Sequence, residues 1–297
     1  MFPIIPANSV TAASGNTEGI FGYGSTGSVT AITNLVSNAG VVASDTVGVG
    51  TAREALAACE YGEDKGIFGY GYNTLSMTNL VSNAGVVASD TAGVGTGRNG
   101  LAACSYGGDK GIFGFGIITA TVSAVTNLVS NAGVVALDTA GVGTTRYNLT
   151  ACEYGEDKGI FGFGHDGSNY VSMTNLVSNA GVVASDTAGV GTAGGDLAAC
   201  GYGGDKGIFG FGYRNAFSAI TNLISNAGVV ASDTVGVGTG RRYIAACEYG
   251  GDKGIFGFGN SGSRVSMTNL VSNAGVVASD TAGIGIARST LAACSFN

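Results

Sequence analysis

Apolar and polar residues alternate along this chain in short runs that fit β-strands better than helices. Between residues 56 and 90, turn-forming residues separate four such runs, 56–61, 66–71, 77–82 and 86–90. The turns are Gly-Glu-Asp-Lys and Asn-Ala-Gly, and the second is suited to a short hairpin. No stretch shows the 3.6-residue apolar period of a helix that packs on a core. The pattern therefore predicts an all-β protein.

The same pattern recurs six times. The string Gly-Ile-Phe-Gly-aromatic-Gly begins at residues 19, 66, 111, 159, 207 and 254, so the repeat is 45 to 48 residues long. Four strands in about 47 residues are typical of one blade of a β-propeller. A parallel β-solenoid, with coils of about 20–30 residues, and an open β-array are the alternatives. We predict a six-bladed β-propeller of four-stranded antiparallel blades.

Strand alternation gives the glycines of each repeat a role. In the second run, Phe68 and Tyr70 are expected on one face, and Ile67, Gly69 and Gly71 on the other. The aromatic face of one blade is then expected to pack against the nearly bare face of its neighbour. Aromatic burial would offset the cost of interior glycine, which is about 0.5–1 kcal/mol relative to alanine.

Composition narrows the class of protein further. The chain has 54 glycines in 297 residues but only two prolines and no Gly-X-Y period, which excludes collagen. With 45% hydrophobic residues it is expected to fold. A net charge of -7 disfavours nucleic-acid binding. No apolar run reaches the length of a membrane span, and residues 1–6 lack the basic start of a signal peptide.

Each repeat carries one cysteine. This spacing is unlike the paired ligands of a structural zinc site, so we expect no metal and interpret the thiols as small buried apolar groups. A ring of thiols lining the central channel is the alternative. The six are Cys59, Cys104, Cys152, Cys200, Cys247 and Cys294.

The order of sequence features within each unit resembles the kelch repeat. In the second unit these features are Arg53, then a predicted strand of small residues at 56–59, then the aromatic strand at 66–71. The chain departs from kelch in having no tryptophan and in replacing an adjacent glycine pair with Gly-aromatic-Gly. The repeats are also similar to glycine-rich repeat proteins of tailed-bacteriophage virions.

The kelch resemblance implies that the Leu-Ala-Ala-Cys strand is innermost in each blade and that residues 291–297 complete the first blade. The predicted domains are an N-terminal arm, residues 1–18, and a propeller, residues 19–297. Residues 9–15 are a degenerate copy of the same strand and compete for its place. If the C-terminal copy takes that place, the arm is free to pair with another edge or subunit.

Differences among the six units concentrate in two segments, one after the aromatic strand and one before the cysteine strand. In an up-and-down blade both segments emerge on the same side, so the sequence on that face of the ring differs from blade to blade. The Asp-Lys and Asn-Ala-Gly turns emerge on the opposite face, where the sequence is the same in nearly every blade. Loops on a rigid scaffold usually carry binding groups, although neutral drift is the alternative. The candidate binding residues are Arg98, Arg146, Tyr147, His165, Tyr213, Arg214, Arg241, Tyr243 and Arg264.

Catalytic motifs are weak throughout. His165 is the only histidine and lies in a variable segment, which disfavours a catalytic pair of a nucleophile and a histidine. The pattern Gly-x-Gly-x-x-Gly occurs, but no predicted helix follows it, so it does not indicate a dinucleotide site. We predict a non-enzymatic structural or binding module without cofactor, located in a virion. Its expected partners are other virion proteins or a host-surface ligand. A multivalent glycan-binding lectin, secreted or at the cell surface, is the alternative, and a glycosidase ranks third.

Overall fold

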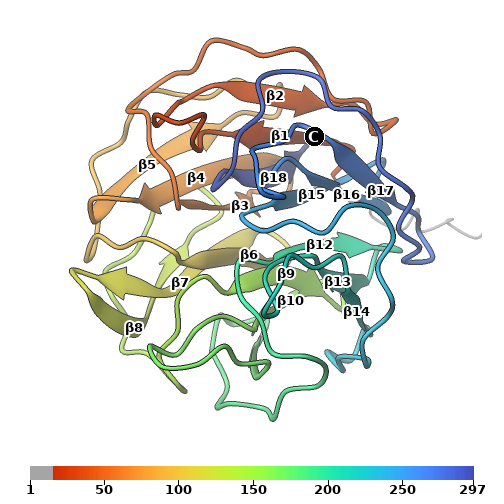
Figure 1. Cartoon of the computed structure of the whole chain (residues 1–297). Coiled ribbons are helices and arrows are strands. Elements are labelled where there is room, and N and C mark those ends of the chain that lie inside the picture. The colour runs from red at the N-terminus through yellow and green to blue at the C-terminus, as the bar shows by residue number, and fades with distance from the viewer. Residues whose placement is uncertain (1–15) are drawn as a thin grey trace, which may run out of the picture.

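The computed structural model describes residues 16–297 and contains eighteen strands (Figure 1). They form six three-stranded antiparallel sheets in a propeller-like arrangement, numbered here along the chain. Sheet 1 contains β18 (Ala292–Phe296), β1 (Glu18–Gly22) and β2 (Thr33–Val36); sheet 2 contains β3 (Ala57–Tyr61), β4 (Lys65–Gly71) and β5 (Leu75–Val81); sheet 3 contains β6 (Ala102–Tyr106), β7 (Lys110–Ile118) and β8 (Thr121–Val129). Sheet 4 contains β9 (Thr150–Tyr154), β10 (Lys158–Gly162) and β11 (Thr174–Val177); sheet 5 contains β12 (Ala198–Tyr202), β13 (Lys206–Gly210) and β14 (Thr221–Ile224); sheet 6 contains β15 (Ala245–Tyr249), β16 (Lys253–Gly257) and β17 (Thr268–Val271).

Each sheet has three strands where four were predicted. In sheet 2 the expected fourth strand, residues 86–90, meets β5 only through isolated bridges at Val87 and Thr91. Between these bridges the Asn79 side chain donates its Nδ2 hydrogens to the Ala88 carbonyl and to the Asp90 carboxylate. A side chain therefore satisfies the backbone there, and the regular ladder stops.

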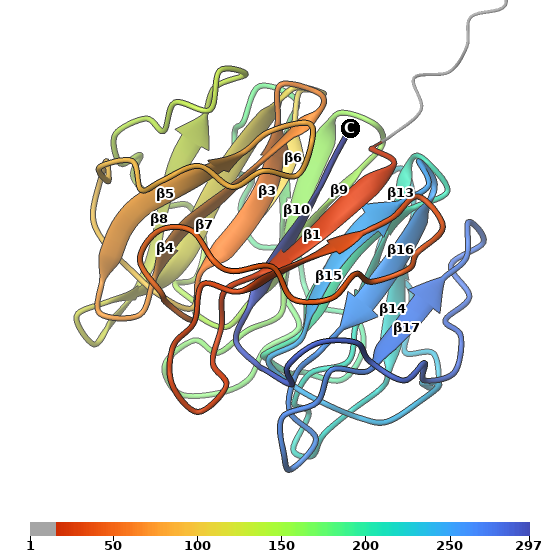
Figure 2. The same ribbon diagram turned by 90° about the horizontal axis from the view of Figure 1, so that it is seen from above.

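Sheet 1 joins the two ends of the described chain. β18 pairs antiparallel with β1, with Cys294 opposite Ile20, and Figure 2 shows the two strands side by side. The Thr17 amide donates to the Asn297 carbonyl at 2.8 Å, at the place where the other sheets have an Asp-Lys turn. The competing segment, residues 9–15, and most of the predicted arm lie outside the described residues.

The innermost strands, β3, β6, β9, β12, β15 and β18, lie next to one another in that order, and β18 lies next to β3. At one end of these strands a backbone hydrogen bond links each sheet to the next. The Gly100 amide donates to the Ala55 carbonyl at 3.0 Å, and the series continues through residues 148, 196, 243 and 290. The Ala55 amide in turn donates to the Thr290 carbonyl at 2.9 Å, so the six bonds form a complete circle.

Aromatic rings pack against glycines of the neighbouring sheet, as the alternation predicts. The Phe68 ring of sheet 2 lies on Gly22 of sheet 1, where an added Cβ would come within 2.7 Å of the Phe68 Cζ. The Cys294 Sγ of sheet 1 lies against Gly66 of sheet 2 in the same way. Both contacts recur between all six pairs of neighbouring sheets. The glycines are therefore where neighbouring sheets approach most closely.

The prediction that Tyr70 shares a face with Phe68 is wrong. Tyr70 has a φ of 65°, and the pairing of β4 with β5 shifts register between Gly69 and Gly71. This irregularity turns the side chain over, so that Tyr70 meets Phe113 of sheet 3 edge to face at 5.1 Å. Each sheet thus offers one aromatic ring to the sheet before it and one to the sheet after it.

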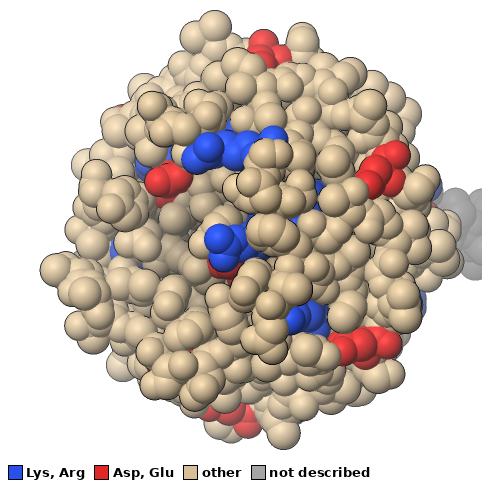
Figure 3. Space-filling model, in the orientation of Figure 1, with Lys and Arg blue, Asp and Glu red and all other residues tan. Residues whose placement is uncertain are grey.

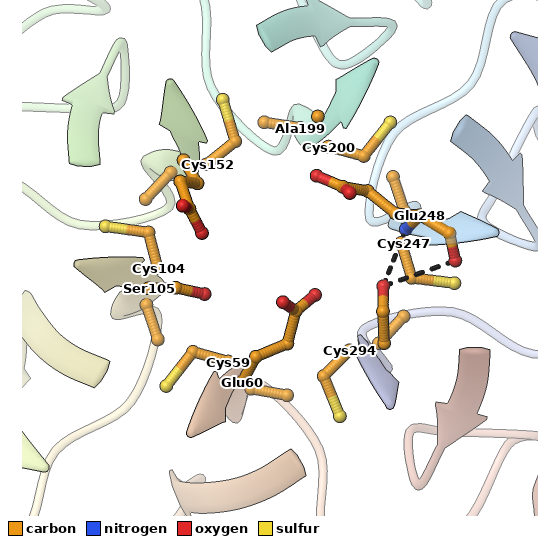
Figure 4. Close-up of a pocket in the computed structure, with 18 residues that line it drawn as sticks. Cys59, Glu60, Cys104, Ser105, Cys152, Ala199, Cys200, Cys247, Glu248 and Cys294 are labelled. Atoms are coloured by element: carbon orange, nitrogen blue, oxygen red, sulfur yellow. Dashed lines mark hydrogen bonds between the residues drawn. The ribbon is translucent and has the colours of Figure 1, made fainter. Parts of the chain in front are cut away.

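The six cysteines are buried and unpaired, as expected. In Figure 4 their sulfur atoms point away from the central space, toward the gaps between sheets. Among residues 16–297, no helix is long and apolar enough to cross a membrane.

Candidate functional site

Four of the nine predicted binding residues are buried, which corrects their assignment to an accessible surface. Arg98, Arg146 and Arg241 are fully buried, and Arg214 is only 7% exposed. Each guanidinium lies over an aromatic ring of the preceding sheet, at 4.4–4.8 Å from the ring centre, and donates from Nη2 to an asparagine Oδ1. These arginines therefore hold neighbouring sheets together.

The arginine cluster is a repeated unit that includes an aspartate. In sheet 2 the Asp90 carboxylate accepts hydrogen bonds from the Thr51 amide and hydroxyl, and lies 3.9 Å from Arg53 Nη1. Burial alone would raise the pKa of Asp90, but bonds from Thr51 and Asn79 outweigh it, and the pKa is lowered. Asp90 and its counterparts thus stabilise the structure.

Arg214 reaches this cluster from an unusual place in the sequence. Gly194 stands where the other five units have arginine, and Arg214 enters instead from the loop after β13. Its Nη2 donates to Asn222 Oδ1 at 2.9 Å, its Nη1 donates to the Thr192 carbonyl at 2.6 Å, and the guanidinium lies over Phe163. Sheet 5 therefore has the same cluster as the other sheets, built from a relocated arginine.

At the variable end of the inner strands lies a cavity of about 380 Å³, the mouth cavity. Its floor consists of one aliphatic side chain from each sheet: Leu56, Leu101, Leu149, Leu197, Ile244 and Leu291. Its rim consists of the six residues of the hydrogen-bonded circle, together with Glu54, Asn260, Arg264 and Ser289. The floor therefore has an aliphatic residue at the same position of all six sheets, whereas the rim residues differ from sheet to sheet.

All six residues of the circle have positive φ values, between 51° and 60°. This conformation costs about 1 kcal/mol or more for any residue except glycine, and the circle of backbone bonds fixes it. The residues are Ala55, Gly100, Asn148, Asp196, Tyr243 and Thr290. The backbone is therefore constant around the rim while the side chains differ from sheet to sheet.

Asp196 is the most perturbed group of the rim. Its side chain is 2% exposed, and its Oδ1 has no hydrogen-bond partner among the described residues. Its Oδ2 lies 4.0 Å from Arg242 Nη1. Burial raises the pKa of Asp196 to about 7, although Arg242 and a side-chain hydrogen bond with Asn148 oppose the shift. A buried acceptor without a donor is costly and is a feature of binding sites.

Beside the mouth cavity, aromatic side chains of sheets 4 and 5 form a continuous group, the aromatic band. Neighbouring ring centres are 5.0–6.2 Å apart. Arg242 of sheet 6 lies over two of these rings and over Tyr243, which joins the band to the rim. The band consists of Tyr147, His165, Tyr170, Tyr213 and Phe217.

The structure thus brings four predicted residues together, Tyr147, His165, Tyr213 and Tyr243, and it places Arg264 on the cavity wall. Sequence reasoning missed the other polar and aromatic groups of the site. All of them lie in the two variable segments: Glu54, Asn148, Tyr170, Asp196, Phe217, Arg242, Asn260, Ser289 and Thr290. Their departure from the other repeats was the available signal.

A second, smaller cavity of about 60 Å³ lies deeper along the axis, between the inner strands. Glu60, Glu153 and Glu248 line it from alternate sheets, and Figure 4 shows Glu60 and Glu248 pointing into it. Burial raises the pKa of all three, to about 8 for Glu248. No group of three or more potential metal ligands is close enough to hold an ion within residues 16–297.

Charge is sparse on the face shown in Figure 3. Basic side chains lie on its central part, around a hollow, whereas acidic side chains lie mostly toward its edge. The five Asp-Lys turns lie at the end of the strands opposite the mouth cavity. In each turn the lysine forms an ion pair with the aspartate that precedes it.

A comparison with models of protein families finds no match, and a comparison with curated proteins finds none either. The all-β repeat fold therefore rests on geometry. The kelch and bacteriophage resemblances remain predictions from the repeat pattern.

Proposed function

We propose that this chain is a non-enzymatic binding module, a closed six-bladed propeller whose mouth cavity receives a ligand. The observation that carries the proposal is the non-repeating polar rim over a sixfold aliphatic floor. Small-molecule sites are concave, mostly apolar and oriented by a few polar groups, with volumes of about 300–1,000 Å³. The mouth cavity lies within this volume range and combines an aliphatic floor with several polar rim groups.

Closure of the propeller is supported by the pairing of β18 with β1 and by the circle of backbone bonds. A closed ring fixes the relative positions of six rim residues that are far apart in sequence. The rim is therefore preorganised, which lowers the entropic cost of binding.

The mouth cavity lies where all six sheets meet and has a rim that does not repeat, which favours one ligand per chain over a multivalent lectin with equivalent pockets between sheets. Those inter-sheet positions are filled by the phenylalanine, cysteine and arginine contacts. A virion protein or a host-surface group as the natural partner rests on the repeat resemblance alone. Co-purification with assembled particles from the natural source tests that part.

The cavity itself is tested by ligand-detected NMR with a library of small polar fragments. Asn260→Trp places an indole over the mouth cavity, and Lys206→Ala, at the start of β13, is the matched control on the opposite face. We expect fragments to bind the wild type and the Lys206 variant alike and to lose binding to the Asn260 variant. Fragments that bind all three proteins equally, or none, would contradict the proposal.

A further inference from the structure

We infer that the mouth cavity binds a neutral saccharide and that the aromatic band extends this site to an oligosaccharide. The inference rests on the proposed function, because it names the ligand class of the same cavity. Four features of the site support it: the amphiphilic lining, the balance of charge, an unsatisfied acceptor, and the adjoining aromatic surface.

The lining matches the amphiphilic character of a pyranose ring. Such a ring presents C–H groups on its faces and hydroxyl groups around its edge. The aliphatic floor offers an apolar surface, and Asn148, Thr290 and Asn260 on the wall carry polar groups that donate and accept. A saccharide placed over the floor therefore meets apolar groups below and hydrogen-bonding groups around it.

The charges near the cavity balance. At about pH 8, above the pKa of Asp196, Glu54 and Asp196 contribute two carboxylates, and Arg264 and Arg242 contribute two guanidinium groups. An anionic ligand would face both carboxylates, and a cationic ligand would face both arginines. Like charges brought together in a partly buried site are costly, so a neutral ligand fits best.

Asp196 provides a specific point of recognition. Its Oδ1 is buried beside the cavity and accepts no hydrogen bond from the described residues. A ligand hydroxyl donates readily to a carboxylate, and such charge-assisted bonds are among the stronger ones. Asp196 is the only acid at its position in the six repeats, so this acceptor exists once in the ring.

The aromatic band gives the site length. Tyr213 and Phe217 lie on the loop after β13, and Phe217 is 40% exposed. Tyrosine rings combine an apolar face with a polar edge, which suits the C–H faces of successive sugar units. Arg242 stacks on both rings and on Tyr243, and so links the band to the cavity rim.

The test uses the full chain and fluorescently labelled tetrasaccharides of glucose, galactose, mannose and N-acetylglucosamine, with fluorescence anisotropy as the readout. Tetramers of glucosamine and of galacturonic acid serve as cationic and anionic probes. We expect at least one neutral series to bind in preference to both charged tetramers. At pH 8, where Asp196 is ionised, Asp196→Asn should weaken that binding about tenfold or more, because a buried charged acceptor is lost. Lys206→Ala should leave the binding unchanged.

The band is tested separately with Phe217→Ala and Tyr213→Ala. Each is expected to weaken tetrasaccharide binding about fivefold while leaving inhibition by the matching monosaccharide unchanged. Because Phe217 is exposed, its truncation should not unfold the protein, and thermal melts check both variants. Equal losses for monosaccharide and tetrasaccharide would contradict the assignment of the band.

The outcomes separate this inference from the proposed function. If NMR fragments bind in a way that Asn260→Trp blocks, but no neutral oligosaccharide binds, the saccharide inference is wrong and the binding cavity stands. Preferential binding of either charged tetramer overturns the inference in the same way. If neither fragments nor oligosaccharides bind, both proposals are wrong.

Discussion

The relocated Arg214 allows a direct test of how neighbouring sheets are held together. Arg214→Ala removes the stacking over Phe163 and three hydrogen bonds, to Thr192, Asn222 and Asp233, and leaves Asn222 Oδ1 buried without its donor. Stacking contributes about 0.5–2 kcal/mol, and a hydrogen bond from a charged group about 1.5–3 kcal/mol. Because the cost of burying the guanidinium offsets part of these contributions, we expect the free energy of unfolding to fall by about 3–5 kcal/mol.

The second perturbation is Gly194→Arg, which restores the residue of the other five repeats. In the wild type a Cβ at Gly194 would come within 2.7 Å of the Arg214 Cγ and 2.8 Å of the Tyr213 carbonyl oxygen, so this variant alone is expected to be destabilised as well. In the double variant the new arginine occupies the space that Arg214 leaves. We expect the double variant to recover part of the loss, since the contact with the Tyr213 carbonyl remains, with a coupling of about 2 kcal/mol or more.

The assay is guanidinium unfolding of the four proteins, followed by circular dichroism and by tyrosine fluorescence. The single change Arg98→Ala, where no second arginine is near, serves as the control. It measures the free energy lost when the arginine cluster of sheet 3 cannot be rebuilt. If the effects of the two changes in sheet 5 simply add, the two positions do not share one site, and the reasoning is refuted.

Three further predictions concern packing, pH and the pairing of β18. Gly69→Ala should lower the free energy of unfolding by about 1–3 kcal/mol, because its Cβ would meet a phenylalanine of the next sheet. Gly108 has a positive φ and free space around it, so Gly108→Ala measures the cost of backbone strain without a steric clash. Burial raises the pKa of Glu248 to about 8 in the folded state, so this group's contribution to stability is fully present below about pH 4.5 and is lost as the pH rises toward 8. The variant Glu248→Gln should flatten this part of the stability profile, and a profile unchanged by the substitution would show that the carboxylate does not titrate there. Deleting residues 291–297 removes β18 from sheet 1 and should lower the Tm far more than deleting residues 1–15, and equal losses would contradict the importance of this pairing.

The repeat pattern was sufficient to predict six sheets and the packing of Phe68 on a glycine of the neighbouring sheet, whereas the inner position of the cysteine strand was implied by the kelch resemblance. It failed for Tyr70, because simple alternation takes no account of an irregular register at a residue with positive φ. The predicted fourth strand failed because the Asn79 side chain takes up the backbone carbonyl that a ladder would need.

Prediction of the site was limited by how the arginines were interpreted. Arg98, Arg146 and Arg241 occupy the same position in their repeats, and this uniformity is a sign of a structural role. The rim residues show the opposite pattern, since Asp196 differs from the residue at its position in every other unit. The cavity itself depends on six segments meeting at the axis, which no local pattern reveals.

The pairing of β18 with β1 also has a consequence for folding kinetics. Each of sheets 2 to 6 forms from one continuous stretch of chain, so only short loops need to close. Sheet 1 instead unites Cys294 with Ile20, across almost the whole chain. Such a contact is slow to form because the entropic cost of closing a long loop comes before any stabilisation. We expect sheet 1 to form last during refolding and to open first during unfolding.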